Sequence, residues 1–274
     1  YDRAGDLFHA DSLQVADLLG RQASNIADGI SRNGDLGAGD QGLMFGYATD
    51  ETAELLPLPL VLSHRLTRGL SEARRGGEAP WLRPDAKAQV TVAYRDGHPE
   101  RVHTVVVSTQ HIDGAPVEDV RRWLRDTFIP RTLGAWWHDG IILHLNPAGP
   151  FVQGGPEADC GVTGRKIIVD TYGGFARHGG GAFSGKDGSK VDRSGAYMAR
   201  LVARGIVQRG IARRAEVQVC YAIGVPDPLA LHVDTFGTGD TDAALHFAQG
   251  FDLRPAAIIE RLRLDTPLFA RTTN

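Results

Sequence analysis

The order and periodicity of the chain's segments predict an α+β fold. Four segments place apolar residues at helical spacing, at residues 57–75, 116–128, 193–209 and 255–264. Shorter segments between them alternate apolar and polar residues or run apolar over the length of a strand. These elements follow one another in β-α-β-β order and not in strict βαβ alternation, which favours sheets packed on helices. The 274 residues, 42% of them hydrophobic, suffice for one large domain or two to three small ones.

The first 35 residues carry the weakest structural signal. Residues 13–19 fit a strand or a short helix, and their periodicity does not distinguish the two. Residues 22–34 are polar and contain glycine, which predicts a mobile loop. Because the sequence opens on Tyr1 and not on Met, we expect this region to be the end of a domain whose beginning is absent.

The next segments predict a helix and a hairpin. Residues 57–75 form the helix, whose buried face carries Leu62, Leu66, Leu70 and Ala73. Residues 90–94 alternate as a strand, Asp96-Gly97 forms a hairpin turn, and residues 102–109 are the returning strand.

The later segments add three helices and several strands. The helix at residues 116–128 turns Val117, Val120, Leu124 and Phe128 inward. Asp192 is placed to cap the helix at residues 193–209, whose buried stripe is Met198, Leu201, Val202 and Ile206. The last helix covers residues 255–264. Further strands are expected at residues 141–145, 151–152, 167–169, 217–221 and 229–235.

Composition argues against several classes of partner. The formal net charge of −3 gives no general affinity for nucleic acid or for an anionic membrane surface. Cys160 and Cys220 form no disulfide framework or zinc pattern, which fits a reducing cytosol. No apolar run approaches the roughly 20 residues of a membrane span. We therefore expect a cytoplasmic protein that binds neither nucleic acid nor membrane.

The most informative stretch is residues 179–192, Gly-Gly-Gly-Ala-Phe-Ser-Gly-Lys-Asp-Gly-Ser-Lys-Val-Asp. Its three successive glycines let the backbone approach a ligand and turn N–H groups toward an anion. Lys186 and Lys190 add positive charge, while Asp187 and Asp192 add the carboxylate oxygens that Mg²⁺ prefers. The stretch predicts a site for magnesium and a polyphosphate. A glycine-rich surface turn with solvated charges is the alternative, and it suits an isolated glycine triplet better than a stretch of this length.

Two further features bear on this site. Residues 180–186 fit the spacing of a P-loop, but Asp187 stands where Ser or Thr should bind Mg²⁺, and the next residues delay the helix. We therefore reject the P-loop. Arg165 and Lys166 lie just upstream and offer the forked and point-charge donors that polyphosphate sites commonly combine.

Three motifs resemble S-adenosylmethionine synthetase (methionine adenosyltransferase) and occur in that family's order. They are Gly-Ala-Gly-Asp-Gln-Gly-Leu-Met-Phe-Gly-Tyr-Ala at 37–48, Leu-Arg-Pro-Asp-Ala-Lys at 82–87, and residues 159–187 with their Gly-Arg-Lys and His-Gly-Gly-Gly sequences. The resemblance implies three similar, intertwined α+β domains. Residues 1–35 would be the remnant of the N-terminal domain, with a flexible loop over the active site. Residues 36–152 would be the central domain and residues 153–274 the C-terminal domain, truncated at its end.

The resemblance implies a transferase of S-adenosylmethionine biosynthesis in one-carbon metabolism. In this reaction the methionine sulfur attacks the ribose 5′ carbon of ATP, and the released triphosphate is hydrolysed to pyrophosphate and phosphate. Because a thioether sulfur needs no deprotonation, catalysis would come from positioning and from stabilising the leaving polyanion. The family uses two Mg²⁺ per site and K⁺. It works as a homodimer or a dimer of dimers, a homotetramer, with sites between subunits.

The resemblance also assigns site residues by motif. Catalysis and triphosphate binding would fall to Arg165, Lys166 and Lys186. Further ATP contacts would come from Asp85 on the ribose, Lys87, Phe151 on the adenine, Asp159, Ala182 and Ile223. Methionine would contact Gln22, Asp40, Asp159 and Lys190, and Mg²⁺ would bind Asp192. Several of these residues have simpler readings, with Asp85 as a turn residue, Phe151 and Ile223 as core, Asp192 as a helix cap and Lys190 as a surface lysine.

The chain departs from the family pattern at four points. The family's His-Pro-Asp-Lys element, which supplies a catalytic His and a Mg²⁺ ligand, and an acidic residue that binds K⁺ are missing from this sequence. Pro150 stands where the family usually has Arg, and Asn25 where its loop usually has an acid. These departures keep a second hypothesis open, a degenerate regulatory partner that binds nucleotide or a catalytic subunit without turnover.

Overall fold

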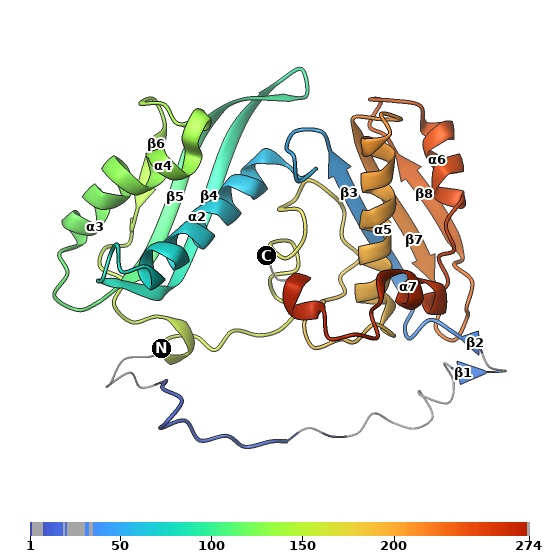
Figure 1. Cartoon of the computed structure of the whole chain (residues 1–274), viewed down its shortest axis with the longest axis horizontal. Helices are drawn as coiled ribbons and strands as arrows, with labels where there is room; N and C mark the ends of the chain where they lie inside the picture. The colour runs from blue at the N-terminus through green and yellow to red at the C-terminus, as the bar shows by residue number, and fades with distance from the viewer. Residues whose placement is uncertain (2–7, 19, 21–30, 33–34, 273–274) are drawn as a thin grey trace. The chain divides into compact units, whose positions relative to one another are not determined.

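A computed structural model describes residues 1, 8–18, 20, 31–32 and 35–272, and it has the mixed α+β architecture that the sequence predicts. The chain divides into two compact units (Figure 1). The first unit consists of residues 1–18 and 58–161, and the second of residues 19–57 and 162–274. The second unit thus combines a segment that precedes residues 58–161 in the sequence with one that follows them. No helix within the described ranges is long and apolar enough to cross a bilayer.

The N-terminal region has little regular structure where it is described. Leu13 to Leu18 form neither of the two elements expected of residues 13–19, and Leu18 is 93% exposed. The predicted loop at residues 22–34, including Gln22 and Asn25, lies outside the described residues except for the short strand β1 (Ser31–Arg32). β1 pairs with β2 (Asp35–Leu36).

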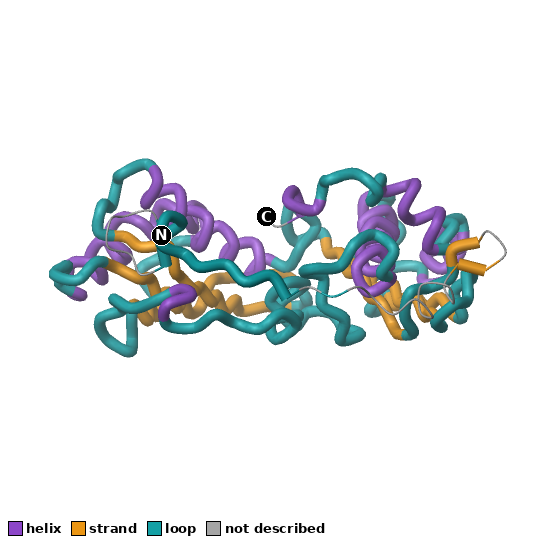
Figure 2. Tube along the Cα trace, turned by 90° about the horizontal axis from the view of Figure 1, so that it is seen from below, coloured by secondary structure: helices purple, strands orange, loops and turns teal. Residues whose placement is uncertain are grey.

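The first unit is a three-stranded sheet with helices on one face (Figure 2). Its strands are β4 (Leu82–Arg95), β5 (His98–His111) and β6 (Ile142–Leu145). β5 pairs antiparallel with β4 and parallel with β6. The hairpin turn is confirmed, because Asp96 and Gly97 both have positive φ, as a type I′ turn requires. The helix α2 (Leu58–Arg75) buries the four apolar residues that the sequence predicted.

The segment expected to be one helix at residues 116–128 is more complex. It consists of α3 (Val117–Trp123), a π-helical turn (Leu124–Phe128) and α4 (Ile129–Leu133). Pro130 explains the interruption, because proline lacks the N–H of a regular helix and its ring clashes with the carbonyl four residues earlier. Val120, Leu124 and Phe128 are buried as predicted, whereas Val117 is only half-buried.

A buried amide holds the ends of β5 and β6 together. Asn146 is 2% exposed and has a φ of 41°. Its Oδ1 accepts the Thr109 N–H at 2.9 Å, and its Nδ2 donates to the Thr109 carbonyl at 3.0 Å. One side chain therefore satisfies both main-chain polar groups of a fully buried residue.

Asn146→Ala is expected to lower the free energy of unfolding by about 2–4 kcal/mol, because two buried main-chain groups lose their partner. Urea unfolding with an unchanged m value measures this loss. Asn146→Asp should lose at least as much, because it removes the donor to the Thr109 carbonyl and buries an unpaired carboxylate. A melting curve of Asn146→Ala that matches the unmutated protein would refute the role of this amide.

The second unit also places helices on one face of a three-stranded sheet (Figure 2). Its antiparallel strands lie in the order β3 (Gly42–Thr49), β7 (Arg214–Tyr221) and β8 (Ala230–Asp234). Its helices are α5 (Val191–Gln208), α6 (Thr241–Gln249) and α7 (Pro255–Leu262). β3 falls within the expected central domain, residues 36–152, yet its partner strand is β7.

Two predicted strands are wrong. Residues 151–152 form no ladder. Among the described residues, Phe151 bonds only to His111, whose N–H donates to the Phe151 carbonyl at 2.9 Å. Residues 167–169 form turns, closed by the Asp170 N–H to the Lys166 carbonyl at 2.9 Å. The apolar side chains of that segment are not a core, since Val169 is 63% exposed. The sequence analysis also did not predict β3 or α6.

Candidate functional site

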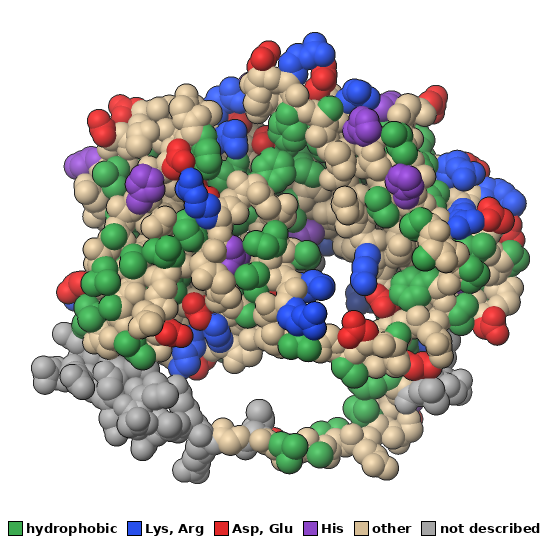
Figure 3. Space-filling model, turned by 180° about the vertical axis from the view of Figure 1, so that it is seen from behind, with side chains coloured by type: hydrophobic (Ala, Val, Ile, Leu, Met, Phe, Trp, Pro, Cys, Tyr) green, Lys and Arg blue, Asp and Glu red, His purple; other side chains and the backbone are tan. Residues whose placement is uncertain are grey.

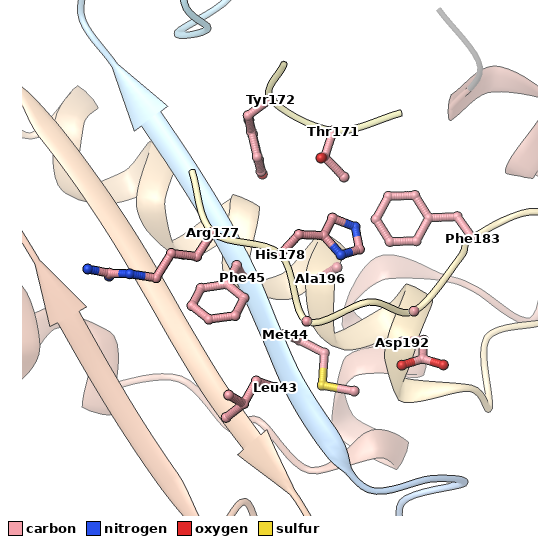
Figure 4. Close-up of a pocket in the computed structure, with 12 residues that line it drawn as sticks. Leu43, Met44, Phe45, Thr171, Tyr172, Arg177, His178, Phe183, Asp192 and Ala196 are labelled. Atoms are coloured by element: carbon pink, nitrogen blue, oxygen red, sulfur yellow. The ribbon is translucent and has the colours of Figure 1, made fainter. Parts of the chain in front are cut away.

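The glycine-rich stretch crosses β3 and ends at the start of α5 (Figure 4). Gly179 lies so close to β3 that a β-carbon there would overlap the main-chain oxygen of Leu43. At Gly181 a β-carbon would overlap the carboxylate of Asp192. Gly180 and Gly185 have positive φ, at 99° and 80°. Glycine is therefore required here by close approach and by backbone conformation.

Arg177 anchors the beginning of this stretch to the sheet. Its N–H donates to Glu216 Oε2 at 2.8 Å, and its Nη1 donates to Glu216 Oε1 at 2.5 Å. Glu216 is on β7 and only 2% exposed. In Figure 4, Arg177 points away from His178 and Phe183, which lie together on the other side of the loop.

Some of the N–H groups that the sequence predicted to face an anion are used inside the loop. The Gly180 N–H donates to His178 Nδ1 at 2.8 Å, and the Lys186 N–H donates to the Phe183 carbonyl at 3.2 Å. Burial lowers the pKa of the His178 imidazole, although Asp170 and Asp192 oppose this shift. An imidazole whose Nδ1 accepts a hydrogen bond from within the loop fits a structural role for His178.

Lys186 and Asp192 form a close ion pair. The Lys186 Nζ donates to Asp192 Oδ2 at 2.5 Å, and the two side chains are 30% and 18% exposed. Asp192 lies in the first turn of α5, where the helix dipole favours a carboxylate. The prediction that Asp192 caps this helix is wrong, because Lys190 occupies the N-cap position and the Asp192 carboxylate turns to Lys186 instead.

The P-loop is excluded by the same geometry. α5 begins at Val191, well after Lys186, so the phosphate-binding lysine of a P-loop has no counterpart here. The residues between Lys186 and Val191 form a turn that Asp187 closes. Asp187 Oδ1 accepts two hydrogen bonds from Ser189, one from its N–H at 2.8 Å and one from its hydroxyl at 2.5 Å. These bonds from Ser189 hold the pKa of the Asp187 carboxyl below its usual range.

The remaining predicted residues of the second unit are accessible. Arg165 and Lys166 lie in an exposed turn, and within the described chain their side chains make no hydrogen bond or ion pair. Asp40 is exposed, and its Oδ1 accepts the Gln41 N–H at 2.8 Å. Ile223 is 49% exposed and forms a parallel bridge with Ala38, so the reading of Ile223 as core is wrong.

Two other predicted residues line the same stretch. Ala182 is half-buried, and a β-carbon at Gly164 would contact its methyl group at 3.4 Å. Ala182 therefore brings the glycine-rich stretch beside the turn that carries Arg165. Among the described residues, the Lys190 ammonium donates only to its neighbour, the Ser189 hydroxyl, at 3.2 Å.

In the first unit, two buried polar residues at the end of β5 hold the predicted nucleotide residues. Gln110 accepts the Asp85 N–H at 3.3 Å and donates to the Val152 carbonyl at 2.8 Å. His111 Nε2 accepts the Phe151 N–H at 3.0 Å. Gln110 and His111 are 3% and 1% exposed. The sequence analysis missed both, because no local pattern marks a polar residue whose partners lie far along the chain.

The predicted acidic residues of this unit are partly engaged. Asp85 Oδ2 accepts the Gly155 N–H at 2.8 Å, and the other carboxylate oxygen has no hydrogen-bond partner among the described residues. Asp159 is exposed, and its Oδ1 accepts the Gly161 N–H at 2.8 Å. Lys87 is exposed on β4. The predicted site residues are therefore divided between the two units.

The donor set fits magnesium that arrives with a polyphosphate. Among the described residues, no group of three or more His, Cys, Asp or Glu side chains is arranged to hold a metal ion. Asp192 offers one carboxylate at the start of a helix, and Mg²⁺ is commonly bound by one or two carboxylates together with water and substrate phosphates. Basic and acidic side chains are interspersed over the face drawn in Figure 3.

Two family models match the chain. The model described as S-adenosylmethionine synthetase, central domain, matches residues 35–151. The model described as S-adenosylmethionine synthetase, C-terminal domain, matches residues 153–274. Together they cover the sequence from β2 to its end, and they occur in the order that the three motifs predicted.

Proposed function

Since the chain belongs to the S-adenosylmethionine synthetase family, we propose that it forms S-adenosylmethionine from ATP and L-methionine. The Lys186–Asp192 ion pair carries the proposal. It places a cation suited to triphosphate and a carboxylate suited to Mg²⁺ side by side, in a loop where Gly179 and Gly181 leave no room for a β-carbon. We further propose that the released triphosphate is hydrolysed to pyrophosphate and phosphate.

The proposed triphosphate contacts are Lys186, Arg165 and Lys166. The latter two have no internal partner in the described chain, so an incoming anion meets donors that are already free. Lys186 would leave Asp192 for the triphosphate, while Asp192 would bind Mg²⁺. When bound, Mg²⁺ neutralises part of the charge on the triphosphate. The chain's own contribution is to hold the anion and to stabilise the charge that develops as it departs.

The other substrate contacts are proposals of the same kind. The free oxygen of Asp85 would bind the ribose hydroxyls, Phe151 would stack on adenine, and Lys87, Asp159, Ala182 and Ile223 would complete the nucleotide contacts. Methionine would be held by Asp40, Asp159 and Lys190, together with Gln22 outside the described residues. The proposal includes a second Mg²⁺ and K⁺, a homodimer or dimer of dimers with sites between subunits, and a cytoplasmic location.

A second candidate function is a non-catalytic partner of such an enzyme. Pro150 favours it, because it replaces the residue that the family usually places before the adenine-stacking Phe151. Incubation of the whole protein with ATP, methionine and Mg²⁺, followed by assay of the sulfonium product, separates the two. Steady product formation supports the enzyme. Nucleotide binding without product supports the non-catalytic partner.

Asp192→Asn is expected to raise the Mg²⁺ concentration needed for half-maximal turnover and to lower maximal turnover. The neutral amide is a poorer ligand for a hard cation, and it no longer pairs with Lys186. Asp187→Asn is the matched control, because Asp187 lies in the same loop but accepts its hydrogen bonds from Ser189. Full activity of Asp192→Asn at low Mg²⁺ would disprove the metal role.

A further inference from the structure

We infer that Arg193 is a positioning residue for Lys186 and that Phe269, near the end of the chain, holds Arg193 in place. This inference rests on the proposed triphosphate role of Lys186. Arg193 follows Asp192 in the first turn of α5 and was not singled out by the sequence. Arg193 is not one of the proposed substrate contacts, but its side chain donates to the backbone carbonyl of Lys186, which is.

The Arg193 guanidinium is buried and directed at the loop that carries Lys186. Arg193 is 7% exposed, and its Nη1 donates to the Lys186 carbonyl at 2.7 Å. The Lys186 N–H is already bonded to the Phe183 carbonyl. The peptide groups on both sides of the Lys186 α-carbon are therefore fixed, which limits the directions that its ammonium group can take.

Phe269 fixes the guanidinium from the other side. It lies in a short 3₁₀ turn (Phe269–Thr272), and the Arg193 Cζ is 3.7 Å from the centre of its ring. This distance is that of a close cation–π stack. Tyr197, one turn further along α5, accepts a hydrogen bond from Arg193 Nε at 3.2 Å and lies 3.0 Å from the Thr272 hydroxyl. The C-terminal turn is thus joined to Lys186 through one side chain.

Two features argue against a purely structural role for Arg193. Within the described residues no carboxylate pairs with Arg193, so its charge is balanced only by a carbonyl, a hydroxyl and a ring. A cation in the first turn of a helix is also disfavoured by the helix dipole. A buried guanidinium in this position costs stability, and its contact with the Lys186 backbone gives that cost a functional reason.

Arg193→Met tests the inference, with Arg200→Met as the matched control. Arg200 is also on α5 and also donates to main-chain carbonyls, those of Tyr47 and Leu55, but it does not contact the Lys186 loop. The measurement is calorimetric binding of inorganic tripolyphosphate with Mg²⁺ to the whole protein, at a temperature where melting curves show each variant folded. We expect Arg193→Met to weaken binding about tenfold and Arg200→Met by less than about twofold.

A double-mutant cycle distinguishes positioning from general loosening. If Arg193 acts through Lys186, Arg193→Met should have almost no effect on tripolyphosphate affinity in a Lys186→Met background. Phe269→Leu provides a milder variant should Arg193→Met fold poorly, and it should weaken binding less than Arg193→Met does. Arg193→Lys, which keeps one donor but lacks the planar stack, should fall between Arg193→Met and the unmutated protein.

The possible outcomes separate the two proposals. If the unmutated protein binds no tripolyphosphate, the proposed function itself fails. If it binds tripolyphosphate but Arg193→Met and Phe269→Leu bind equally well, the positioning role is wrong. Equal losses in Arg193→Met and Arg200→Met, or a full loss that persists in the Lys186→Met background, would also overturn it.

Discussion

Lys186→Met is expected to lower turnover about a hundredfold, an effect typical of removing one donor that stabilises transition-state charge. Charge grows on the ribose-side oxygen of the triphosphate as the sulfur attacks. A donor aimed at that oxygen stabilises the transition state more than it stabilises bound ATP. Methionine keeps much of the apolar stem of the lysine and removes only its charge. Single-turnover product formation at saturating ATP and methionine measures this effect.

The thermal stability of Lys186→Met should change little. The ion pair with Asp192 is partly exposed to solvent, and such pairs contribute little to folding. Asp192 also stays in the first turn of α5, where the helix dipole still favours it. Arg165→Met should lower turnover similarly, and the double variant should be less than additive because both residues hold one anion. Product formation by Lys186→Met at the unmutated rate would mean that this stretch does not bind the polyphosphate.

Gly181→Ala should have the second-largest effect, a loss of turnover approaching a hundredfold, because small displacements of catalytic groups cost this much. The added methyl group would overlap the Asp192 carboxylate and force it away from Lys186. Gly180→Ala is the matched control. A β-carbon there meets nothing within 4 Å, so the only cost is backbone strain from a φ of 99°. Gly180→Ala should therefore lower the thermal stability of the protein but retain most of its turnover.

The steric cause of the Gly181→Ala effect is itself testable. In an Asp192→Ala background the overlap with the carboxylate is gone and only a 2.7 Å approach to the β-carbon of residue 192 remains, so Gly181→Ala should lower turnover less than it does when Asp192 is present. Steady-state assays of the four proteins in this cycle measure the coupling. Equal losses from Gly181→Ala with and without the Asp192 carboxylate would show that the glycine acts in another way.

Elements with strong local periodicity were predictable from the sequence. α2 was found from its apolar stripe, and the hairpin of β4 and β5 from its alternation and from Asp96-Gly97. β3 was missed because six of its eight residues are buried, which removes alternation, and because Gly46 leaves room for the α5 backbone. At residues 167–169 a strand was predicted where none exists, since three apolar residues in a row also occur in an exposed turn.

The candidate site was predictable where its residues are close in sequence. Lys186 and Asp192 were expected to act together, and the structure joins them directly. Arg193 and Phe269 were not predictable, because their contact depends on how the end of the chain folds back on α5. The role of Gln110 was not predictable for the same reason, since Gln110 is on β5 and its partners, Asp85 and Val152, lie far from it in the sequence.

The most direct test is a single turnover of the whole protein, mixed in excess over ATP with saturating methionine and Mg²⁺ and then quenched. The products to quantify are S-adenosylmethionine, tripolyphosphate and ADP. We predict that S-adenosylmethionine forms in the same amount as ATP is lost, that tripolyphosphate appears before pyrophosphate and phosphate, and that no ADP forms. Conversion of ATP to ADP without a sulfonium product, or recovery of all the ATP unchanged, would contradict the proposal that this chain is an S-adenosylmethionine-forming enzyme.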